Sequence, residues 1–238
     1  RLYHGGVRLT DKRVFVTTFE LITFFVMLLA LYAIFIYAPV EKTMGIVQKI
    51  FYLHVPSAFL SFFAFFITFL ASIIYLYKRD QRWDVIASCS AEIGVIFCTV
   101  VLITGPIWAK PIWDVWWTWD PRLTTTLILW FIYIAYLMIR GVVGENQRSN
   151  FSAVFGILGF VNVPITFLAI RVWRTIHPVI ITRAGINIST PMRHTLVIAL
   201  VAFCLLFFWL LMNRIRLEKL KIKTEEISAL LEDRIHLG

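Results

Sequence analysis

Long apolar runs alternate with short polar segments along this chain, and six of the runs are long enough to cross a bilayer. A spanning helix needs about 20 mostly apolar residues, and the fourth run approaches the lower limit of roughly 17. The first run is too long for the apolar core of a signal peptide and lacks a small-residue cleavage site, so we expect it to be retained. The pattern predicts an all-α fold, a polytopic membrane bundle of six transmembrane helices at residues 15–38, 51–77, 84–104, 123–139, 153–172 and 194–213.

Composition supports a membrane protein, and the placement of charge predicts its orientation. The 238 residues are 60% hydrophobic and 16% charged, which is too apolar for a soluble domain. Most lysines and arginines fall in the N-terminal arm, the loops after the second and fourth spans, and the tail. Basic residues favour the cytoplasmic side. We therefore expect both termini to be cytoplasmic and the loops 39–50, 105–122 and 173–193 to lie at the outer face. The net charge of +9 indicates orientation rather than nucleic-acid binding.

Two domains are expected: a six-helix transmembrane domain over 1–213 and a cytoplasmic amphipathic tail over 214–238. Four apolar residues of the tail recur at heptad-like spacing, and either anionic lipid or a transporter subunit is a candidate partner for this helix. They are Leu217, Leu220, Ile227 and Leu231.

The three cysteines, Cys89, Cys98 and Cys204, fall within predicted spans. The sequence has no C-x-x-C pair and no C-x-x-C-H haem attachment site, which argues against a thiol oxidoreductase and against a c-type cytochrome.

A tryptophan cluster marks the loop between the third and fourth spans. Five of the nine tryptophans lie between Trp108 and Trp119, whereas an interfacial aromatic belt spreads over several helix ends. If residues 113–120 are helical, Trp113, Trp116, Trp117 and Asp120 share one face. A flat porphyrin could stack on such a wall.

Charged residues at the end of this loop have more than one candidate role. Arg122 could pair with a haem propionate. Asp120 could orient Arg122 or cap a helix that begins at Leu123. With Trp173 and Arg174 of the third outer loop, the candidate haem-binding residues are Trp113, Trp116, Trp117, Trp119, Asp120, Arg122, Trp173 and Arg174.

Two histidines are candidate iron ligands. Apolar positions between Ile46 and Phe51 recur at helical spacing and lead to His54, which predicts a short helix on the membrane surface with Pro56 in the first turn of the next span. His177 lies just beyond the fifth span, on the same predicted face. Imidazole suits iron, and a porphyrin leaves two axial positions for it. A hydrogen bond to neighbouring backbone is the alternative for His54. For His194, which opens the sixth span on the same face, a helix-start hydrogen bond is expected and a third iron ligand is the alternative.

Two features within the spans also carry predictions. Glu92 lies inside the third span, where a carboxylate faces the bundle interior or a polar path. A neutral, hydrogen-bonded Glu92 is the expectation, with a proton or haem path as the alternative. Asn162 and Pro164 predict a locally opened helix in the fifth span.

Four segments resemble the haem-handling protein type C of cytochrome c maturation, also called haem exporter protein C, within the tryptophan-rich "WWD" family. The resemblance covers about 47–193 and rests on Tyr-Leu-His-Val-Pro at 52–56, Trp-Trp-Thr-Trp-Asp-Pro-Arg-Leu-Thr at 116–124, Val-Asn-Val-Pro-Ile at 161–165 and Trp-Arg-Thr-Ile-His at 173–177. This chain departs from the family at Val172, usually Trp, and at Pro178, usually Gln, so its contacts with a chaperone need not follow the family's.

The resemblance implies a multi-pass protein of the bacterial inner membrane that presents haem b at the periplasmic face. It implies His54 and His177 as the two axial ligands. The haem passes to a membrane-anchored haem chaperone in cooperation with ABC transporter subunits. A small single-span membrane subunit is a further candidate partner, and nucleic acid is not.

The expected protein is a carrier without catalytic residues, not an enzyme. The main alternative is a haem lyase that attaches haem to apocytochrome c, because larger relatives with more helices carry the same tryptophan signature. A membrane cytochrome of the b type is less favoured, because no histidine lies in the middle of a predicted span.

Overall fold

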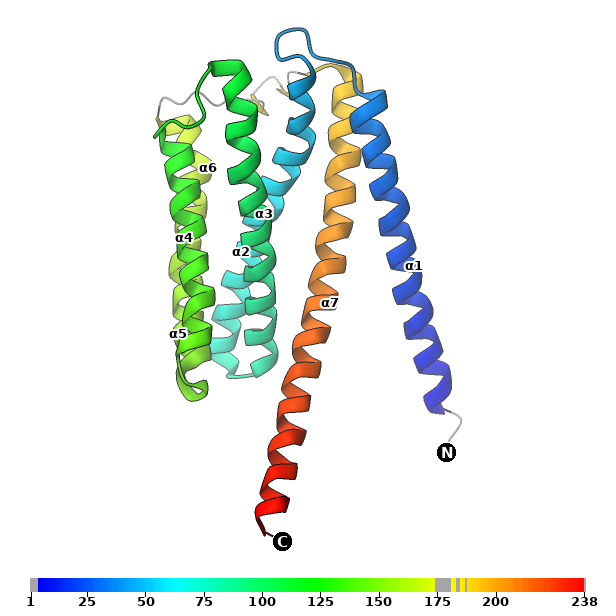
Figure 1. The fold of residues 1–238 in the computed structure, drawn as a ribbon, viewed down its shortest axis with the longest axis vertical. Helices are drawn as coiled ribbons and strands as arrows, with labels where there is room; N and C mark the ends of the chain where they lie inside the picture. Colours follow the sequence, from blue (N-terminus) through cyan, green and yellow to red (C-terminus); the bar gives the residue numbers. More distant parts are fainter. Residues whose placement is uncertain (1–3, 174–180, 183–184, 187, 238) are drawn as a thin grey trace. The chain divides into compact units, whose positions relative to one another are not determined.

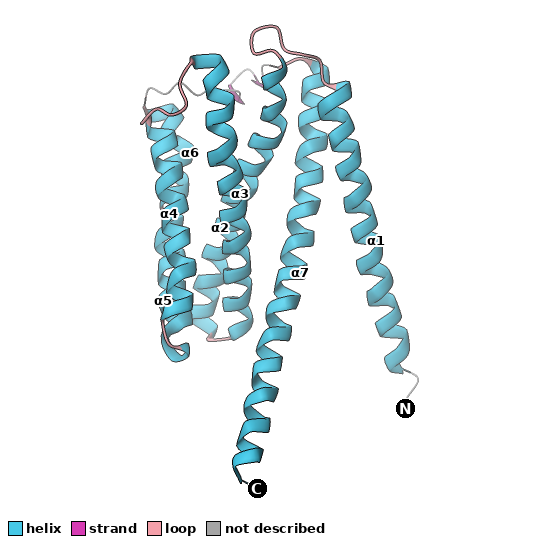
Figure 2. Ribbon diagram, viewed as in Figure 1, coloured by secondary structure: helices cyan, strands magenta, loops and turns pink. Residues whose placement is uncertain are grey.

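Helices form nearly all of the computed structural model, which describes residues 4–173, 181–182, 185–186 and 188–237 (Figures 1 and 2). Side chains are described for 14–144, 147–169, 172–173 and 188–233. The helices are α1 (His4–Tyr32), α2 (Phe51–Lys78), α3 (Gln81–Trp113), α4 (Pro121–Val142), α5 (Glu145–Phe160), α6 (Asn162–Val172) and α7 (Thr190–Leu237). Shorter elements are the π-helical turn η1 (Ala33–Tyr37), the 3-10 turn η2 (Ile46–Ile50) and the antiparallel pair β1 (Ile181–Thr182) and β2 (Gly185–Ile186).

Within the described chain, six helical segments are long and apolar enough to cross a membrane, which confirms the predicted bundle of six spans. Several extend past the apolar runs, because helices continue through flanking polar residues. The segments are Val14–Tyr37, Ile46–Lys78, Gln81–Trp113, Pro121–Val142, Gln147–Ala169 and Thr190–Asp233.

The chain forms two compact units, and α2, α3 and α7 contribute to both. The first unit comprises Arg1–Ser57, Ile103–Trp117 and Pro178–Trp209. The second unit comprises Ala58–Leu102, Thr118–His177 and Leu210–Gly238.

The core of the first unit joins the starts of α2 and α7 to the last turns of α3. Phe51, Tyr52, Trp108, Met192 and Leu196 are buried in one cluster. Two polar contacts of the same unit involve η1 and the middle of α1. The Tyr37 hydroxyl lies 3.3 Å from Nδ1 of His194, and the Trp209 indole donates to Glu20 over 3.4 Å. The contact of His194 matches the hydrogen-bonding role predicted for it.

The second unit has an aromatic core, in which α4 lies beside both α5 and α6 (Figure 1). Phe65 of α2 stacks on Tyr133 of α4, with ring centroids 3.7 Å apart and planes 12° apart. Leu129 and Tyr136 are buried in the same cluster. Gly94 of α3 lets this ring pair approach, since a Cβ there would fall 2.6 Å from the Phe65 ring.

Gly94→Ala is expected to destabilise the protein by about 1–3 kcal/mol, because an added methyl group overpacks a filled core. Gly141→Ala is the matched control, since a Cβ at that helical position would meet nothing within 4 Å. It should be neutral or stabilising by up to about 1 kcal/mol, as expected from helix propensity. Unfolding of both variants in the same detergent checks this, and equal stabilities would contradict the proposed close packing at Gly94.

The fifth span is locally opened at the predicted place, between α5 and α6. Pro164 has no N–H to donate to the carbonyl one turn earlier. The amide of Val161 instead bonds to the Leu158 carbonyl over 3.2 Å, a tighter turn than an α-helix makes. The side-chain amide of Asn162 donates to the Thr125 carbonyl of α4 over 2.8 Å. This side-chain hydrogen bond attaches the break to α4 inside the unit.

Three features of α2 and α3 differ from the sequence-based prediction. α3 does not end at residue 104 but continues to Trp113 through Pro106 and Pro111. η2 leads directly into α2, so no separate surface helix precedes the second span. Pro56 lies in the second turn of α2 rather than the first.

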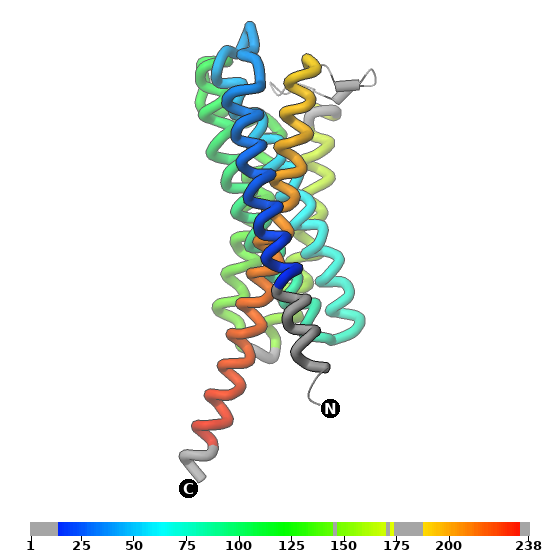
Figure 3. Tube along the Cα trace, turned by 90° about the vertical axis from the view of Figure 1, so that its right-hand side faces the viewer, coloured from blue at the N-terminus to red at the C-terminus, as the bar shows by residue number. Residues whose placement is uncertain are grey.

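α7 is one unbroken helix from the sixth span into the predicted tail, and Figure 3 draws it from golden yellow to red.

Candidate functional site

His54 lies in the first turn of α2, half-buried, and two residues of α3 hold its ring. Its Nδ1 is 2.9 Å from the Thr104 hydroxyl. Its ring meets Trp108 edge-on, with centroids 5.9 Å apart and planes 64° apart. The ring also passes close to the helix backbone, because a Cβ at Gly105 would lie 3.6 Å from Cε1. These contacts fix the plane of the imidazole.

Trp108 extends this site into the core of the first unit. It is 7% exposed, and its indole meets the Phe51 ring edge-on at 6.1 Å. Phe51 in turn meets Tyr52 at 5.4 Å and 72°. Edge-to-face contacts of this kind stabilise aromatic clusters beyond the area they bury. The start of α2 is therefore a rigid aromatic platform that carries His54.

Several polar atoms of this cluster are fully buried in the described structure. They belong to the side-chain amide of Gln48, the hydroxyl of Tyr52 and the indole nitrogen of Trp108. Gln48 is 3% exposed and Tyr52 is 0% exposed. A buried polar group left unsatisfied costs about 1–3 kcal/mol. The Gln48 side chain and the Tyr52 hydroxyl bond to each other, which offsets part of this cost within the core.

A lysine and a glycine order the chain that leads into α2. Lys49 donates to the Phe35 carbonyl in the π-helical turn over 2.6 Å, which ties η2 to η1. Gly45 adopts φ 63°, a conformation that favours glycine, and precedes the first residue of η2.

The Glu41 carboxylate orders the loop before η2. Backbone N–H groups of Met44 and Thr43 donate to this carboxylate and hold the pKa of Glu41 below its ordinary value. Glu41 therefore stays charged at neutral pH and keeps its contacts to the loop.

The tryptophan loop is irregular after Trp113, so the condition for a shared helical face at 113–120 is not met. α3 ends at Trp113, and Asp114 turns the chain with φ 57°. Lys110 closes this helix end by bonding the Asp114 carboxylate at 2.6 Å and its carbonyl at 3.1 Å. Trp116 is 60% exposed.

Asp120 and Arg122 open α4 in the second unit. The Asp120 carboxylate accepts from the Leu123 N–H over 3.0 Å, with Pro121 in the first helical turn, which confirms the capping role. Arg122 is half-buried in the first turn. Trp119, just before the cap, is 75% exposed.

The predicted site residues are divided between the units. His54, Trp113, Trp116 and Trp117 belong to the first unit, and Trp119, Asp120, Arg122 and Trp173 belong to the second. Trp173 ends α6 and is 51% exposed. Arg174 and His177 lie outside the described residues, so their roles stay predictions.

Thr104 and Trp108 were not predicted as contacts of His54. The available signals were a threonine at the end of an apolar run and the first tryptophan of the cluster. Neither of these signals shows that the residue contacts His54, which lies 50 residues before Thr104 along the chain.

Ion pairs within the second unit occupy the carboxylates of its spans. Arg214 of α7 bonds both carboxylate oxygens of Glu92 and reaches Glu218 at 2.8 Å. The expectation of a neutral Glu92 is therefore replaced by a charge pair. Arg140 of α4 holds Asp84 of α3 in a bidentate pair, at 2.6 and 2.8 Å.

Comparison with known proteins agrees with these landmarks. A family model described as heme exporter protein C matches residues 7–229. Heme exporter protein C of Bradyrhizobium diazoefficiens is 32% identical over 201 residues, which cover 83% of this chain and 76% of that protein. The protein of the same name from Paracoccus denitrificans is 30% identical over 197 residues, or 81% and 80% of the two chains. That of Escherichia coli K12 is 32% identical over 181 residues, or 76% and 74%. The chain belongs to the heme exporter protein C family.

Proposed function

We propose that this chain binds haem at the outer face of the bacterial inner membrane and delivers it to a haem chaperone for maturation of c-type cytochromes. The observation that carries the proposal is the His54 imidazole, oriented by Thr104 and Trp108 on a rigid aromatic platform. Membership of the heme exporter protein C family supports the same cargo.

The chemistry of His54 suits an axial ligand. With Nδ1 engaged by Thr104, Nε2 is the nitrogen through which the ring would bind iron. A hydrogen bond to the other ring nitrogen is the usual way in which a ligating histidine is oriented. His177 would supply the second axial position, which makes the haem b site bis-histidine.

The other candidate haem-binding residues suit the porphyrin ring and its propionate groups. Exposed indoles such as Trp116 and Trp119 offer flat apolar faces. Trp113, Trp117 and Trp173 would add to that wall, and Arg122 and Arg174 would pair with propionates. None of these roles requires a bond-making residue, so the proposal is a carrier rather than a lyase.

Delivery implies a reversible site and a protein acceptor. The acceptor would have to displace the proposed ligands His54 and His177 before haem leaves this chain. ABC transporter subunits and a small single-span subunit are the proposed membrane partners.

Transfer of haem between proteins tests this function directly. The purified chain, reconstituted with haem, should absorb in the Soret region. Adding the soluble domain of a haem chaperone in excess should move that absorbance to the chaperone after affinity separation. Haem retained at every chaperone concentration contradicts delivery, and no absorbance after reconstitution contradicts binding.

Thr104→Val is expected to lower haem affinity by about 10–100-fold, the usual effect of removing a partner that orients a metal ligand. Thr104→Ser keeps the hydroxyl and should stay close to wild type. Haem titration followed by absorbance measures both affinities. Equal losses in the two variants would mean that packing, not the bond to His54, is what matters at Thr104.

A further inference from the structure

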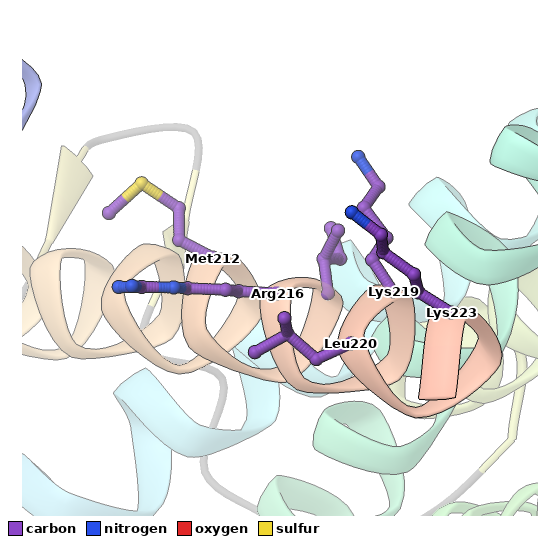
Figure 4. A pocket seen from close by; sticks show the side chains of 6 residues that line it. Met212, Arg216, Lys219, Leu220 and Lys223 are labelled. Carbon is purple, nitrogen blue, oxygen red and sulfur yellow. The ribbon is translucent and has the colours of Figure 1, made fainter. Parts of the chain in front are cut away.

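A shallow hollow on α7, just beyond the sixth apolar run, has no role in the proposed haem site. One face of this helix lines it (Figure 4). Its side chains combine three apolar residues with three cations. They are Met212, Ile215 and Leu220, and Arg216, Lys219 and Lys223.

The three cations are not used by the ion pairs of α7. Within the described chain, those pairs are Arg214 with Glu92, Arg214 with Glu218, and Lys221 with Glu225. Lys219 and Lys223 are four residues apart on the helix, where like charges repel. Glu226 follows on the same side one turn later, so the basic stretch is limited to 216–223. A positive hollow of this kind is complementary to an anion.

The distance from the apolar run places these cations at the membrane surface. A helix rises about 1.5 Å per residue, so the Cα atoms of residues 216–223 lie roughly 4–15 Å beyond residue 213. The headgroup layer of one leaflet is about 5–8 Å thick. Helical side chains lean toward the N-terminus, which here is the direction of the bilayer. Figure 4 shows Arg216 extending along the helix toward Met212. Lysine and arginine side chains can thus return their charges to the headgroup layer.

We propose that this hollow binds the headgroup of an anionic phospholipid. The lipid phosphate would lie among Arg216, Lys219 and Lys223, and the upper part of an acyl chain would lie along Met212 and Ile215. A lipid fits better than an acidic soluble protein, because the hollow begins at Met212, within the sixth apolar run. With the charge-based topology, the lipid belongs to the cytoplasmic leaflet.

Native mass spectrometry of the full-length protein, equilibrated with phosphatidylglycerol or phosphatidylcholine, tests the proposal. The wild type should prefer phosphatidylglycerol. Lys219→Gln should lower that preference about fivefold, the usual contribution of one cation near an anionic surface. Lys221→Gln is the matched control, because Lys221 carries the same charge two residues away and pairs with Glu225 at 3.9 Å. It should leave the preference unchanged.

Two outcomes would overturn the lipid site. One is an equal effect of Lys219→Gln and Lys221→Gln, which would mean that only total charge matters. The other is a wild type without preference for phosphatidylglycerol, as expected if the hollow receives an acidic protein instead. Haem absorbance should be unchanged in Lys219→Gln, which separates this proposal from the haem-binding function.

Discussion

Replacing His54 with alanine is expected to abolish the six-coordinate haem spectrum of the purified protein. The substitution removes a proposed axial ligand and leaves Thr104 and Trp108 without the ring that they orient. The loss of affinity should exceed the roughly 10–100-fold that follows loss of a partner hydrogen-bonded to a metal ligand. His177→Ala should have a similar effect. Visible spectra of wild type and both variants, before and after haem is added, measure the change.

His194→Ala is the control for this experiment. His194 belongs to the same unit as His54, but its contact is with Tyr37 of η1, so its loss should not alter the haem spectrum. Adding haem separates loss during purification from loss of a ligand, and circular dichroism reports folding. A wild-type spectrum in the folded double variant of His54 and His177 would exclude both histidines as ligands.

The membrane spans were predictable because they depend on local composition. A run of about 20 apolar residues can satisfy its backbone in a bilayer only as a helix, whatever it packs against. The cap at Asp120 and the break before Asn162 were predictable for a similar reason. In each case the chemistry of one side chain or of a nearby proline determines the local backbone.

The end of α3 was not predictable from local signals. Pro106 and Pro111 in the segment 105–113 are typical of a loop, yet the structure continues the helix through both. Burial of Trp108 in the core of the first unit offsets the hydrogen bonds that the prolines remove. Tertiary packing therefore overrides local preference here, and it is this packing that brings Thr104 and Trp108 to His54.

The pairing of charges that lie far apart along the chain could not be predicted from the sequence either. Glu92 could be placed within a span, but its partner Arg214 is 122 residues away. The apolar pattern alone assigned Arg214 to the tail. In the structure the same helix carries the span and the tail, so Arg214 remains close enough to neutralise Glu92.

The pair of Asp84 and Arg140 provides the second large prediction: Asp84→Asn should destabilise the protein by about 3–5 kcal/mol. The two side chains are only 6% and 13% exposed, and the guanidinium holds both carboxylate oxygens. Removing the carboxylate leaves the guanidinium of Arg140 buried without its counter-charge. Because the site is buried, little water can solvate the guanidinium in place of the carboxylate. Arg140→Met should cost a similar amount for the converse reason. Because the penalty arises from the charge left behind, the double variant should be more stable than the sum of the two losses predicts.

Unfolding of all variants in one detergent, combined in a double-mutant cycle, measures that coupling. Lys110 and Asp114 supply the matched control, since they also form a 2.6 Å ion pair but are 38% and 93% exposed. An exposed pair contributes less than about 1 kcal/mol, because water solvates each charge after the other is removed. Equal effects at the buried and exposed pairs would show that burial does not determine the strength of the Asp84 pair. A large coupling confined to Asp84 and Arg140 would instead identify this ion pair as the stronger polar link between α3 and α4, beside the 2.8 Å hydrogen bond that the Trp130 indole donates to the Thr99 hydroxyl.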